Sequence, residues 1–583
     1  MKKLVVIVAI VGVMGLGAQV PGPWRQAATD GPNDYLKADS TFNQFVRDMC
    51  VGSDLDQDGK PEIIMTDYKD GGRIHVFEVV GNDSIQEVWT FQGGTGNPTS
   101  QPARSVTVGD LDGDGKGEII VAMTGDSGDT LDTHVGLWVF EWDGNVGSDT
   151  YGINGLPSER YIDFLREADG TLPDRVRAED IAVGDFDGDG TEEVLWVNNA
   201  STTFDNAYIF SISGDIGTGF TAPIVEKVFR RTDYGFGGST NGAYGPMDLD
   251  GDGHPEGVIG VWNRGAFAIF ESEAPDSYAL KYYVEGLDSS DLFPCNKLSA
   301  IYDYDHDGRD EFFFSGEYPG SYSPYYASGI YIVNVDGNDI DPSTVSIDTL
   351  HIDNSTFGLD GFSVGDVDND GQFEIYALFS INRIAVSAEY HGGDVGDTLS
   401  YNVEPILPDV FFYAETTIVG TDTVLYYYQP SIVIKPGDDL DHDGYKEVVF
   451  EVYEGVSNSN YPYQPWDTGF LRVAEYTATG VNEWTVLPPK GSKPVFNSVT
   501  PNPLKNFATI SFTLPSRDDV TINVYDASGR LVKSLFNGTM DDGRHTVRWD
   551  GTDLRGMKVS NGVYILRLEA STGTAVKKVL VLR

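Results

Sequence analysis

The chain is poor in cysteine and in positive charge. Cys50 and Cys295 are the two cysteines among 583 residues, so disulfides cannot hold the fold together. We expect both to be buried free thiols, because each precedes a different, non-adjacent repeat. Lys and Arg number 39 against 90 Asp and Glu, and the net charge of −51 argues against a surface for nucleic acid or anionic membranes. Disorder does not explain this acidity, since 40% of the residues are hydrophobic and 12% are aromatic.

Long hydrophobic runs are also scarce, and the one that exists lies at the start. Leu4–Leu16 follows the basic Met1–Lys3 and precedes the small residues Gly17 and Ala18. A membrane-spanning helix needs about 20 apolar residues, so this run predicts a secretory signal peptide over residues 1–18. An N-terminal membrane anchor is the alternative. After a leader over 19–39 we expect a secreted protein with no transmembrane segment.

What the chain does have is one acidic loop in seven copies. Each copy reads D-x-D-x-D-G-x-x-E, with Asp at loop positions 1, 3 and 5, Gly at position 6 and Glu at position 9. The seven acid sets are Asp54, Asp56, Asp58 and Glu62; Asp110, Asp112, Asp114 and Glu118; Asp185, Asp187, Asp189 and Glu193; Asp248, Asp250, Asp252 and Glu256; Asp303, Asp305, Asp307 and Glu311; Asp366, Asp368, Asp370 and Glu374; Asp439, Asp441, Asp443 and Glu447.

This spacing has a chemical reason. Carboxylates at positions 1, 3 and 5 converge in a tight turn, and Gly at position 6 permits the reversal, as in the first half of an EF-hand loop. Here the closing acid stands at position 9 rather than 12, and a β-rich apolar run follows instead of a helix. A plain Asp/Gly surface turn explains one copy, not seven in one register. We predict about seven structural Ca²⁺ ions, because Mg²⁺ prefers a stricter octahedron.

The repeats also predict the fold. Intervals between loops are 56, 75, 63, 55, 63 and 73 residues, and each loop is followed by an apolar run such as Ile119–Val121 and then by a second β-rich run such as Leu137–Glu141. A fourth run often follows, for example Val88–Phe91 and Trp484–Val486. Four strands per repeat and seven repeats predict an all-β protein with a seven-bladed β-propeller over residues 40–487. An open solenoid is the alternative.

These repeats resemble the FG-GAP family, the integrin-α-like or VCBS-type propeller repeats. The resemblance rests on the D-x-D-x-D-G loops and covers residues 40–490. It implies that calcium binds between the first two strands of each blade, on the acids given above. It does not imply integrin-like ligand recognition, because the chain contains no Arg-Gly-Asp.

A second module follows a Pro/Gly/Ser-rich linker at residues 488–494. Residues 491–583 carry 13 Lys and Arg against 8 Asp and Glu, so the charge changes sign there. Alternating apolar residues, as in Thr509–Leu514 and Gly562–Leu568, predict a small Ig-like β-sandwich over 495–583.

This module resembles the type A C-terminal sorting domain of type IX secretion cargo, whose sequences grade into the Ig-like domain of the flagellar hook-capping protein. The motifs are Pro501–Pro503, Val524–Val532, Trp549–Asp553, Gly562–Tyr564 and the basic-aliphatic end Lys577–Arg583. The resemblance implies a diderm bacterium, an outer-membrane secretion machinery as partner, and delivery to the cell surface or medium. A plain Ig-like spacer is the alternative.

No residue set predicts catalysis. Gly361–Gly365 matches the nucleophile-elbow pattern G-x-S-x-G, but Ser363 aligns with strand residues of other repeats and calcium ligands follow instead of a helix. The 8 histidines form no H-E-x-x-H pair, and we expect the side chains of His254, His306 and His442 to face solvent.

The first hypothesis is therefore a secreted or surface-displayed binding protein for an extracellular glycan or protein. Its ligand would contact aromatic segments such as Tyr318–Tyr326 and Tyr461–Trp466, although ordinary packing explains them equally well. The alternative is an extracellular polysaccharide lyase or hydrolase on a calcium-binding propeller. A lyase needs basic residues against an acidic sugar, and Arg230–Arg231 is the single Arg pair in the chain.

Overall fold

The computed structural model describes most of the chain from Asp48 onward. The described residues are 48–582 without 68–71, 82–83, 93–102, 125–134, 163–164, 166–177, 199–204, 219–220, 236–239, 262–265, 286–292, 318–327, 353–360, 380–383, 398–399, 407–413, 420–421, 459–460, 478–479, 484, 488–492, 501, 505–506, 527 and 541–542. The predicted signal peptide and leader, residues 1–39, lie outside them. Within the described part, no helix has the length and hydrophobicity needed to cross a membrane.

Seven antiparallel sheets follow one another along the chain, each built from consecutive strands. The first three are β1 (Asp48–Ser53), β2 (Glu62–Asp67), β3 (Arg73–Gly81) and β4 (Ser84–Gln92); β5 (Ala103–Gly109), β6 (Glu118–Met123), β7 (Gly136–Glu141) and β8 (Glu159–Tyr161); β9 (Ala178–Gly184), β10 (Glu193–Asn198), β11 (Asn206–Ser213) and β12 (Ala222–Arg230). A short helix, α3 (Arg231–Tyr234), follows β12.

The remaining four sheets repeat the arrangement. They are β13 (Thr240–Met247), β14 (Glu256–Val261), β15 (Ala266–Ala274) and β16 (Ser277–Glu285); β17 (Phe293–Tyr302), β18 (Glu311–Glu317), β19 (Ser328–Val335) and β20 (Val345–Ile352); β21 (Gly361–Gly365), β22 (Glu374–Phe379), β23 (Ile384–Tyr390) and β24 (Tyr401–Ile406); β25 (Ala414–Val419), β26 (Asp422–Pro436), β27 (Glu447–Asn458), β28 (Tyr461–Thr477) and β29 (Gly480–Glu483). These sheets confirm the predicted all-β class, and six of the seven repeats form the predicted four strands, whereas the seventh has five.

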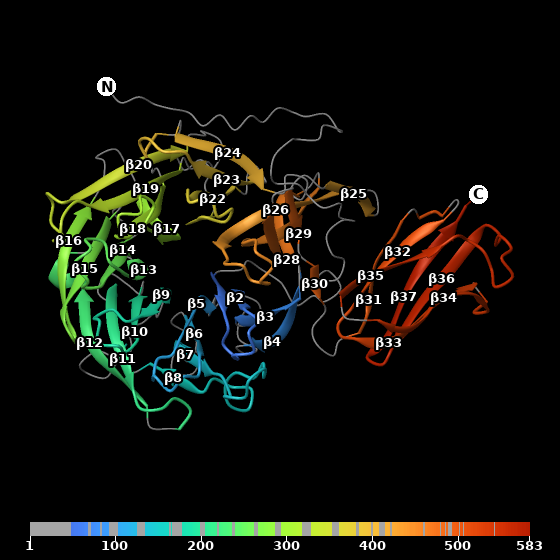
Figure 1. The fold of residues 1–583 in the computed structure, drawn as a ribbon, viewed down its shortest axis with the longest axis horizontal. Helices are drawn as coiled ribbons and strands as arrows, with labels where there is room; N and C mark the ends of the chain where they lie inside the picture. Colours follow the sequence, from blue (N-terminus) through green and yellow to red (C-terminus); the bar gives the residue numbers. More distant parts are fainter. Residues whose placement is uncertain are drawn as a thin grey trace.

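The seven sheets run around a ring, from the first sheet in blue to the seventh in orange (Figure 1). The inner strands of neighbouring sheets contact each other: β1 with β5, β5 with β9, β9 with β13, β13 with β17, β17 with β21, and β26 with both β21 and β1.

Burial of both faces of each sheet explains the apolar runs after the acidic loops. Strands β6, β10 and β14 are buried along their whole length. In β6, Ile119 and Val121 pack into a core shared with the first sheet, whereas Ile120 and Ala122 pack into a core shared with the third. A strand with apolar neighbours on both sides loses the polar alternation of a half-exposed strand, so its sequence is a continuous hydrophobic run.

A polar contact also links the inner strands of the first three sheets. The Ser105 Oγ on β5 lies 2.5 Å from Asp48 Oδ2 on β1 and 2.9 Å from Asp180 Oδ1 on β9. Asp48 also accepts the Val106 N–H at 3.1 Å, and Asp180 accepts the Ala243 N–H of β13 at 3.2 Å. Buried polar groups need such partners, and here the partners lie on neighbouring sheets.

The segment that leaves the seventh sheet differs from the prediction. Trp484–Val486 was expected as the fourth strand of the last repeat, which is wrong, because β29 already pairs with β28. Instead β30 (Thr485–Leu487) pairs in parallel with β4 of the first sheet. Strand β4 is at the outer edge of the first sheet, so one side of its backbone N–H and C=O groups is left unpaired by β1–β3. Strand β30 pairs with that side.

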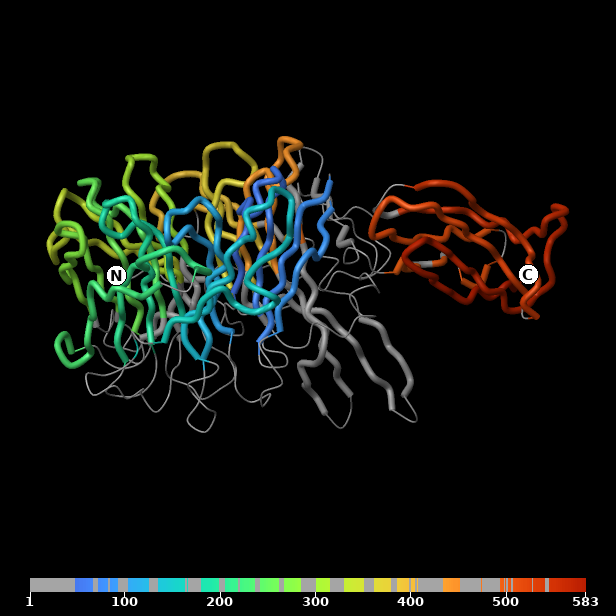
Figure 2. The backbone as a smooth tube through the Cα atoms, turned by 90° about the horizontal axis from the view of Figure 1, so that it is seen from below, coloured from blue at the N-terminus to red at the C-terminus, as the bar shows by residue number. Residues whose placement is uncertain are grey.

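Beyond β30 the chain forms two further antiparallel sheets. One contains β31 (Val495–Thr500), β32 (Ala508–Leu514) and β35 (Gly543–Trp549); the other contains β33 (Asp518–Asp526), β34 (Leu531–Met540), β36 (Gly562–Ala570) and β37 (Gly573–Val581). They enclose a separate core around Trp549, whose Nε1–H donates to the Thr552 carbonyl at 3.0 Å. This pair of sheets lies beside the ring, next to the first sheet (Figures 1 and 2). On β4 of the first sheet, Gln86 Nε2 donates a hydrogen bond to the Pro515 carbonyl at 2.8 Å.

Candidate metal centre

The seven acidic loops occupy equivalent places in the seven sheets. Six join the first two strands of their sheet, and the seventh joins β26 to β27. In six loops the N–H of the position 6 Gly donates to the position 1 Asp at 2.9–3.1 Å. The fourth loop uses the Gly251 N–H on Asp248 at 2.8 Å. Each position 5 N–H donates to the position 3 carboxylate at 3.1–3.2 Å.

Two backbone positions in each loop have positive φ. The position 6 glycines have φ between +84° and +101°, a conformation that residues with a Cβ rarely adopt. Position 4 also lies in the left-handed region, with Gln57, Gly113, Gly188, Gly251, His306, Asn369 and His442 at φ from +57° to +76°. The sequence analysis recognised position 6 and missed position 4, although Gly and Asn at four of these seven sites are a usable signal.

The position 9 Glu closes each loop from the next strand. One of its oxygens accepts the N–H of position 2 at 2.6–3.0 Å in all seven loops. Its other oxygen, Oε1, is buried, and the described residues supply no hydrogen bond to it in Glu62, Glu118, Glu256 and Glu374. Burial raises the pKa of Glu62, Glu118, Glu193 and Glu256 to about 9, and that of Glu311 and Glu374 to about 8.

The position 3 Asp contributes a second buried oxygen. The Oδ2 atoms of Asp56 and Asp250 are buried, and the described residues supply no hydrogen bond to them either. Burial raises the pKa of Asp56, Asp112 and Asp250 above the ordinary value. A buried carboxylate oxygen without a donor is costly, and a bound cation removes that cost.

The predicted ligands come together in space. Asp110, Asp112, Asp114 and Glu118 each offer one oxygen within 4.8 Å of the others, and so do Asp366, Asp368, Asp370 and Glu374. Smaller groups form from Asp54, Asp56 and Glu62 and from Asp185, Asp187 and Glu193. The loops at 248–256, 303–311 and 439–447 fold through the same backbone-to-carboxylate bonds. All donors are hard oxygens, so the residues fit Ca²⁺ or a similar hard cation.

Strand register places a second Glu opposite the position 9 Glu in five of the sheets. The position 9 Glu stands directly across from a Glu on the next strand in the pairs Glu62–Glu78, Glu118–Glu141, Glu256–Glu271, Glu374–Glu389 and Glu447–Glu475. Like charges directly opposite each other destabilise a sheet unless a cation lies nearby. Register alone reveals these pairs, and the sequence analysis did not predict them.

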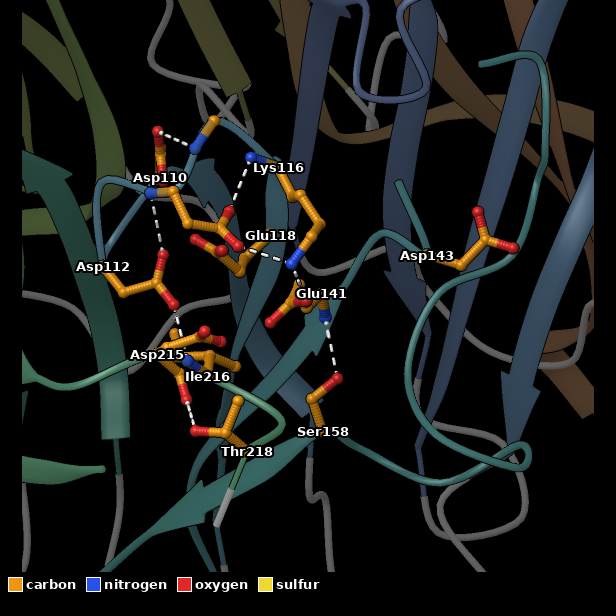
Figure 3. Close-up of polar contacts among 12 residues, drawn as sticks. Asp110, Asp112, Lys116, Glu118, Glu141, Asp143, Ser158, Asp215, Ile216 and Thr218 are labelled. Carbon is orange, nitrogen blue, oxygen red and sulfur yellow. Dashed lines mark hydrogen bonds and ion pairs between the residues drawn. The ribbon is translucent and has the colours of Figure 1, made fainter. Parts of the chain in front are cut away.

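In the second sheet a lysine takes part in this cluster (Figure 3). Lys116 Nζ contacts the Asp114 carboxylate and donates to Glu141 Oε1 at 2.7 Å. These bonds raise the pKa of the Lys116 ammonium above its ordinary value. Lys60 in the first sheet contacts Asp58 Oδ2 at 2.5 Å and also Glu78.

Neighbouring loops also contact one another. The carboxylate of Glu192, at position 8 of the third loop, accepts the Asp110 N–H of the second at 2.7 Å. Asp310 accepts the Asp248 N–H in the same way at 3.0 Å. Lys446 Nζ donates to the Asp366 carbonyl at 2.9 Å. Position 8 of one loop therefore reaches position 1 of the preceding loop, a contact the sequence analysis missed.

The other sequence predictions can be placed as well. His254, His306 and His442 are exposed, as expected. Ser363 lies within β21 and is buried, which confirms that it is a strand residue. Cys50 is a free thiol whose pKa burial raises to about 12, whereas the side chain of Cys295 lies outside the described residues. The side chains of Tyr318–Tyr326 and Tyr461–Trp466 also lie outside them.

Two family models match parts of the chain. The FG-GAP-like repeat matches residues 54–121, from the first acidic loop through the second, and the FlgD Ig-like domain matches residues 504–574. The resemblance to FG-GAP repeats and the resemblance to the hook-cap Ig-like domain are confirmed over those residues. The basal-body rod modification protein FlgD of Salmonella typhimurium is 41% identical over 56 residues, which are 10% of this chain and 24% of that protein. The chain thus spans about a quarter of the length of the curated relatives it matches.

The solved structures that match this chain are distant from it. PorZ, described as a surface component of the type IX secretion system of Porphyromonas gingivalis, is 13% identical over 93% of this chain and 82% of that chain, with a TM-score of 0.18. A family 43 arabinoxylan arabinofuranohydrolase from Bacillus subtilis is 11% identical over 94% of this chain and 98% of that chain, with a TM-score of 0.27. Neither likeness bears on function at these scores.

Proposed function

We propose that the chain is a calcium-stabilised binding protein, secreted or displayed at the cell surface, whose seven sheets form a closed seven-bladed propeller over residues 40–487. One observation carries the calcium assignment. In four loops the position 9 Glu has a buried carboxylate oxygen to which the described residues supply no hydrogen bond, and each of these loops carries three Asp residues. Contacts of β26 with β1 and β21 support closure of the ring.

Each loop would hold one ion through its Asp at positions 1, 3 and 5 and its Glu at position 9. Bound Ca²⁺ supplies two positive charges to four carboxylates that otherwise repel one another, by roughly 1 kcal/mol per pair at 4 Å even in water. The loop backbone holds those carboxylates in place through the N–H bonds described above. The role is structural, because the ions order the ends of strands on which the ring depends.

Calcium removal tests this proposal directly. At a hundredfold excess over Kd each site contributes about 2.7 kcal/mol, so seven sites together have a large effect. We expect excess EGTA to lower the melting temperature by tens of degrees, and titration calorimetry to count about seven ions per chain. A melting curve unchanged by EGTA would refute a structural role for calcium.

We propose that residues 495–583, beyond a linker at 488–494, form a sorting domain that engages an outer-membrane secretion machinery. The terminal motifs and the FlgD Ig-like match over 504–574 support it. Deleting 495–583 in the native producer should leave the ring folded but retained in the cell envelope. Normal surface delivery of the truncated chain would contradict a sorting role.

The ligand of the ring is proposed only by class, as an extracellular glycan or protein. No site geometry in the described part of the chain favours the polysaccharide lyase or hydrolase alternative. Incubating the calcium-loaded chain with neutral and acidic polysaccharides separates the two: product formation lost in EGTA indicates an enzyme, and retention without product indicates a binding protein.

A further inference from the structure

The first two acidic loops differ from the others in having a lysine at position 7. Lys60 and Lys116 each place the ammonium between the position 5 Asp of their loop and a Glu on the third strand of their sheet. The partners are Asp58 and Glu78 in the first sheet and Asp114 and Glu141 in the second. The same contact therefore forms twice, in two loops 56 residues apart in the sequence.

The ammonium sits beside two carboxyl groups that face each other across the sheet. Glu78 pairs across the sheet with Glu62, and Glu141 pairs with Glu118. Glu62, Glu78 and Glu118 are at most 4% exposed, so water screens these charges poorly. The lysine supplies one positive charge to each of these two clusters from within the chain itself.

The lysine ammonium also contacts a carboxylate oxygen of the position 5 Asp that a calcium ion in the loop would need as a ligand. The Asp58 Oδ1 accepts the Lys60 backbone N–H at 2.9 Å, while its Oδ2 contacts the Lys60 Nζ at 2.5 Å. Asp114 has the same two partners, with its Oδ1 2.8 Å from the Lys116 N–H. For calcium to bind the Oδ2 atom of Asp58 or Asp114, the lysine ammonium has to leave that oxygen.

The other five loops have no such lysine. Position 7 is Thr191, His254, Arg309, Gln372 or Tyr445. Arg309 is the one permanent cation among them, and its Nε stays 3.8 Å from the Asp307 Oδ2. Its Nη1 instead donates to the carbonyls of Val335 and Gly337.

We propose that Lys60 and Lys116 are tethered counter-ions that keep the first two loops folded without calcium and compete with calcium for Asp58 and Asp114. The competition rests on the calcium-binding function proposed above, whereas the calcium-free stabilisation does not. The chain then has two classes of loop. Two loops keep their shape at low calcium and bind the ion more weakly, and five depend on the ion for their shape.

Hydrogen exchange of the full-length chain in EGTA tests the first half of this proposal. We expect amides of residues 54–62 and 110–118 to be more protected than those of 366–374. In the double variant Lys60→Met, Lys116→Met, which keeps the aliphatic stems, that protection should fall about fivefold at each loop. Lys60→Arg with Lys116→Arg should restore most of it, because the charge returns.

Lys281→Met is the matched control. Lys281 Nζ bonds Glu271 at 2.9 Å, and Glu271 stands across from Glu256, so this variant removes one positive charge beside the same kind of Glu pair. Within the described residues Lys281 forms its ion pair with Glu271 and none with a loop Asp, so this variant should leave exchange at 54–62 and 110–118 unchanged. Equal exchange in the wild type and the double methionine variant would overturn the proposal.

A calcium titration, followed by exchange at each loop, tests the second half. The double methionine variant should protect residues 54–62 and 110–118 at several-fold lower calcium than the wild type, with 366–374 unchanged. If calcium changes the hydrogen exchange of no loop in the wild type, the proposed calcium function is wrong. The comparison in EGTA would still decide whether the lysines stabilise their loops. Unchanged calcium dependence in a chain that does bind calcium would refute the competition.

Discussion

Replacing the Glu256 carboxylate by an amide is the sharpest test of the loop chemistry. Glu256 is fully buried, and its Oε2 accepts the Leu249 N–H at 2.6 Å. Its Oε1 is buried, and the described residues supply no hydrogen bond to it. Glu256→Gln keeps the shape and the acceptor for Leu249 but removes the negative charge. The variant therefore separates the structural bond from the charge that would bind the ion.

The expected effect changes with calcium. Without calcium, burial raises the pKa of Glu256 to about 9, so near pH 7 the carboxyl is already mostly protonated and resembles the amide. The variant should then be as well protected as the wild type. With calcium at a hundredfold excess over Kd, the wild-type site contributes about 2.7 kcal/mol, which is about a hundredfold in exchange protection. The variant should lose most of that gain.

Hydrogen exchange of residues 248–256, with and without calcium, is the assay. A local measurement is needed because a chain with several sheets and several separate cores does not unfold in two states. Exchange at 110–118 should keep its calcium dependence, which shows that the rest of the ring is intact. Glu569→Gln, on the exposed face of β36, is the control and should change neither condition.

Two results would refute the reasoning. Equal loss of protection with and without calcium would mean that Glu256 acts only through its bond to the Leu249 N–H. Full calcium-dependent protection in the variant would mean that the position 9 Glu is not a ligand.

Three further predictions follow from the contacts described above. In calcium-free protein, burial raises the pKa of the position 9 glutamates from 4.5 to about 8 or 9, so the native state binds more protons than the unfolded state. The melting temperature should therefore fall as pH rises from about 5 to 9. A melting temperature that rises over this range would contradict the burial of these glutamates. Ser105→Ala removes the hydroxyl between Asp48 and Asp180, which should cost about 1–3 kcal/mol in the hydrogen-exchange protection of β5 in the calcium-loaded chain; a value within error of zero would show that the bridge is not needed. Gln86→Ala removes the bond to the Pro515 carbonyl and should speed proteolytic cleavage at 488–494 without changing calcium binding; unchanged cleavage would mean that this contact does not hold the terminal sheets to the ring.

Local pattern was enough to predict much of the fold and of the candidate site. The acidic loops mark the turns, and apolar runs such as Ile119–Val121 mark the strands after them, because each such strand is buried on both faces. Seven loops implied seven sheets, and seven are found along residues 48–483. The rejection of Ser363 as a nucleophile also required only the alignment of repeats.

The sequence pattern did not predict contacts between residues that are distant in the sequence. Trp484–Val486 has strand character, but nothing local shows that β30 pairs with β4, about 400 residues earlier. β34 (Leu531–Met540) was not predicted, since its alternation is weak at the sheet edge. Lys60 looks like an ordinary surface lysine until strand register places Glu78 beside it.

The amino-acid sequence by itself determined the all-β class, the seven acidic loops and the types of ligand atom they carry. Those properties depend on spacing within nine residues, and short-range spacing is written directly in the chain. Tertiary structure decided which charges meet: the Glu pairs across strands, the lysines between them, the contacts from loop to loop and the serine between Asp48 and Asp180. These contacts arise from sheet register and from the stacking of sheets, which join residues tens to hundreds of positions apart.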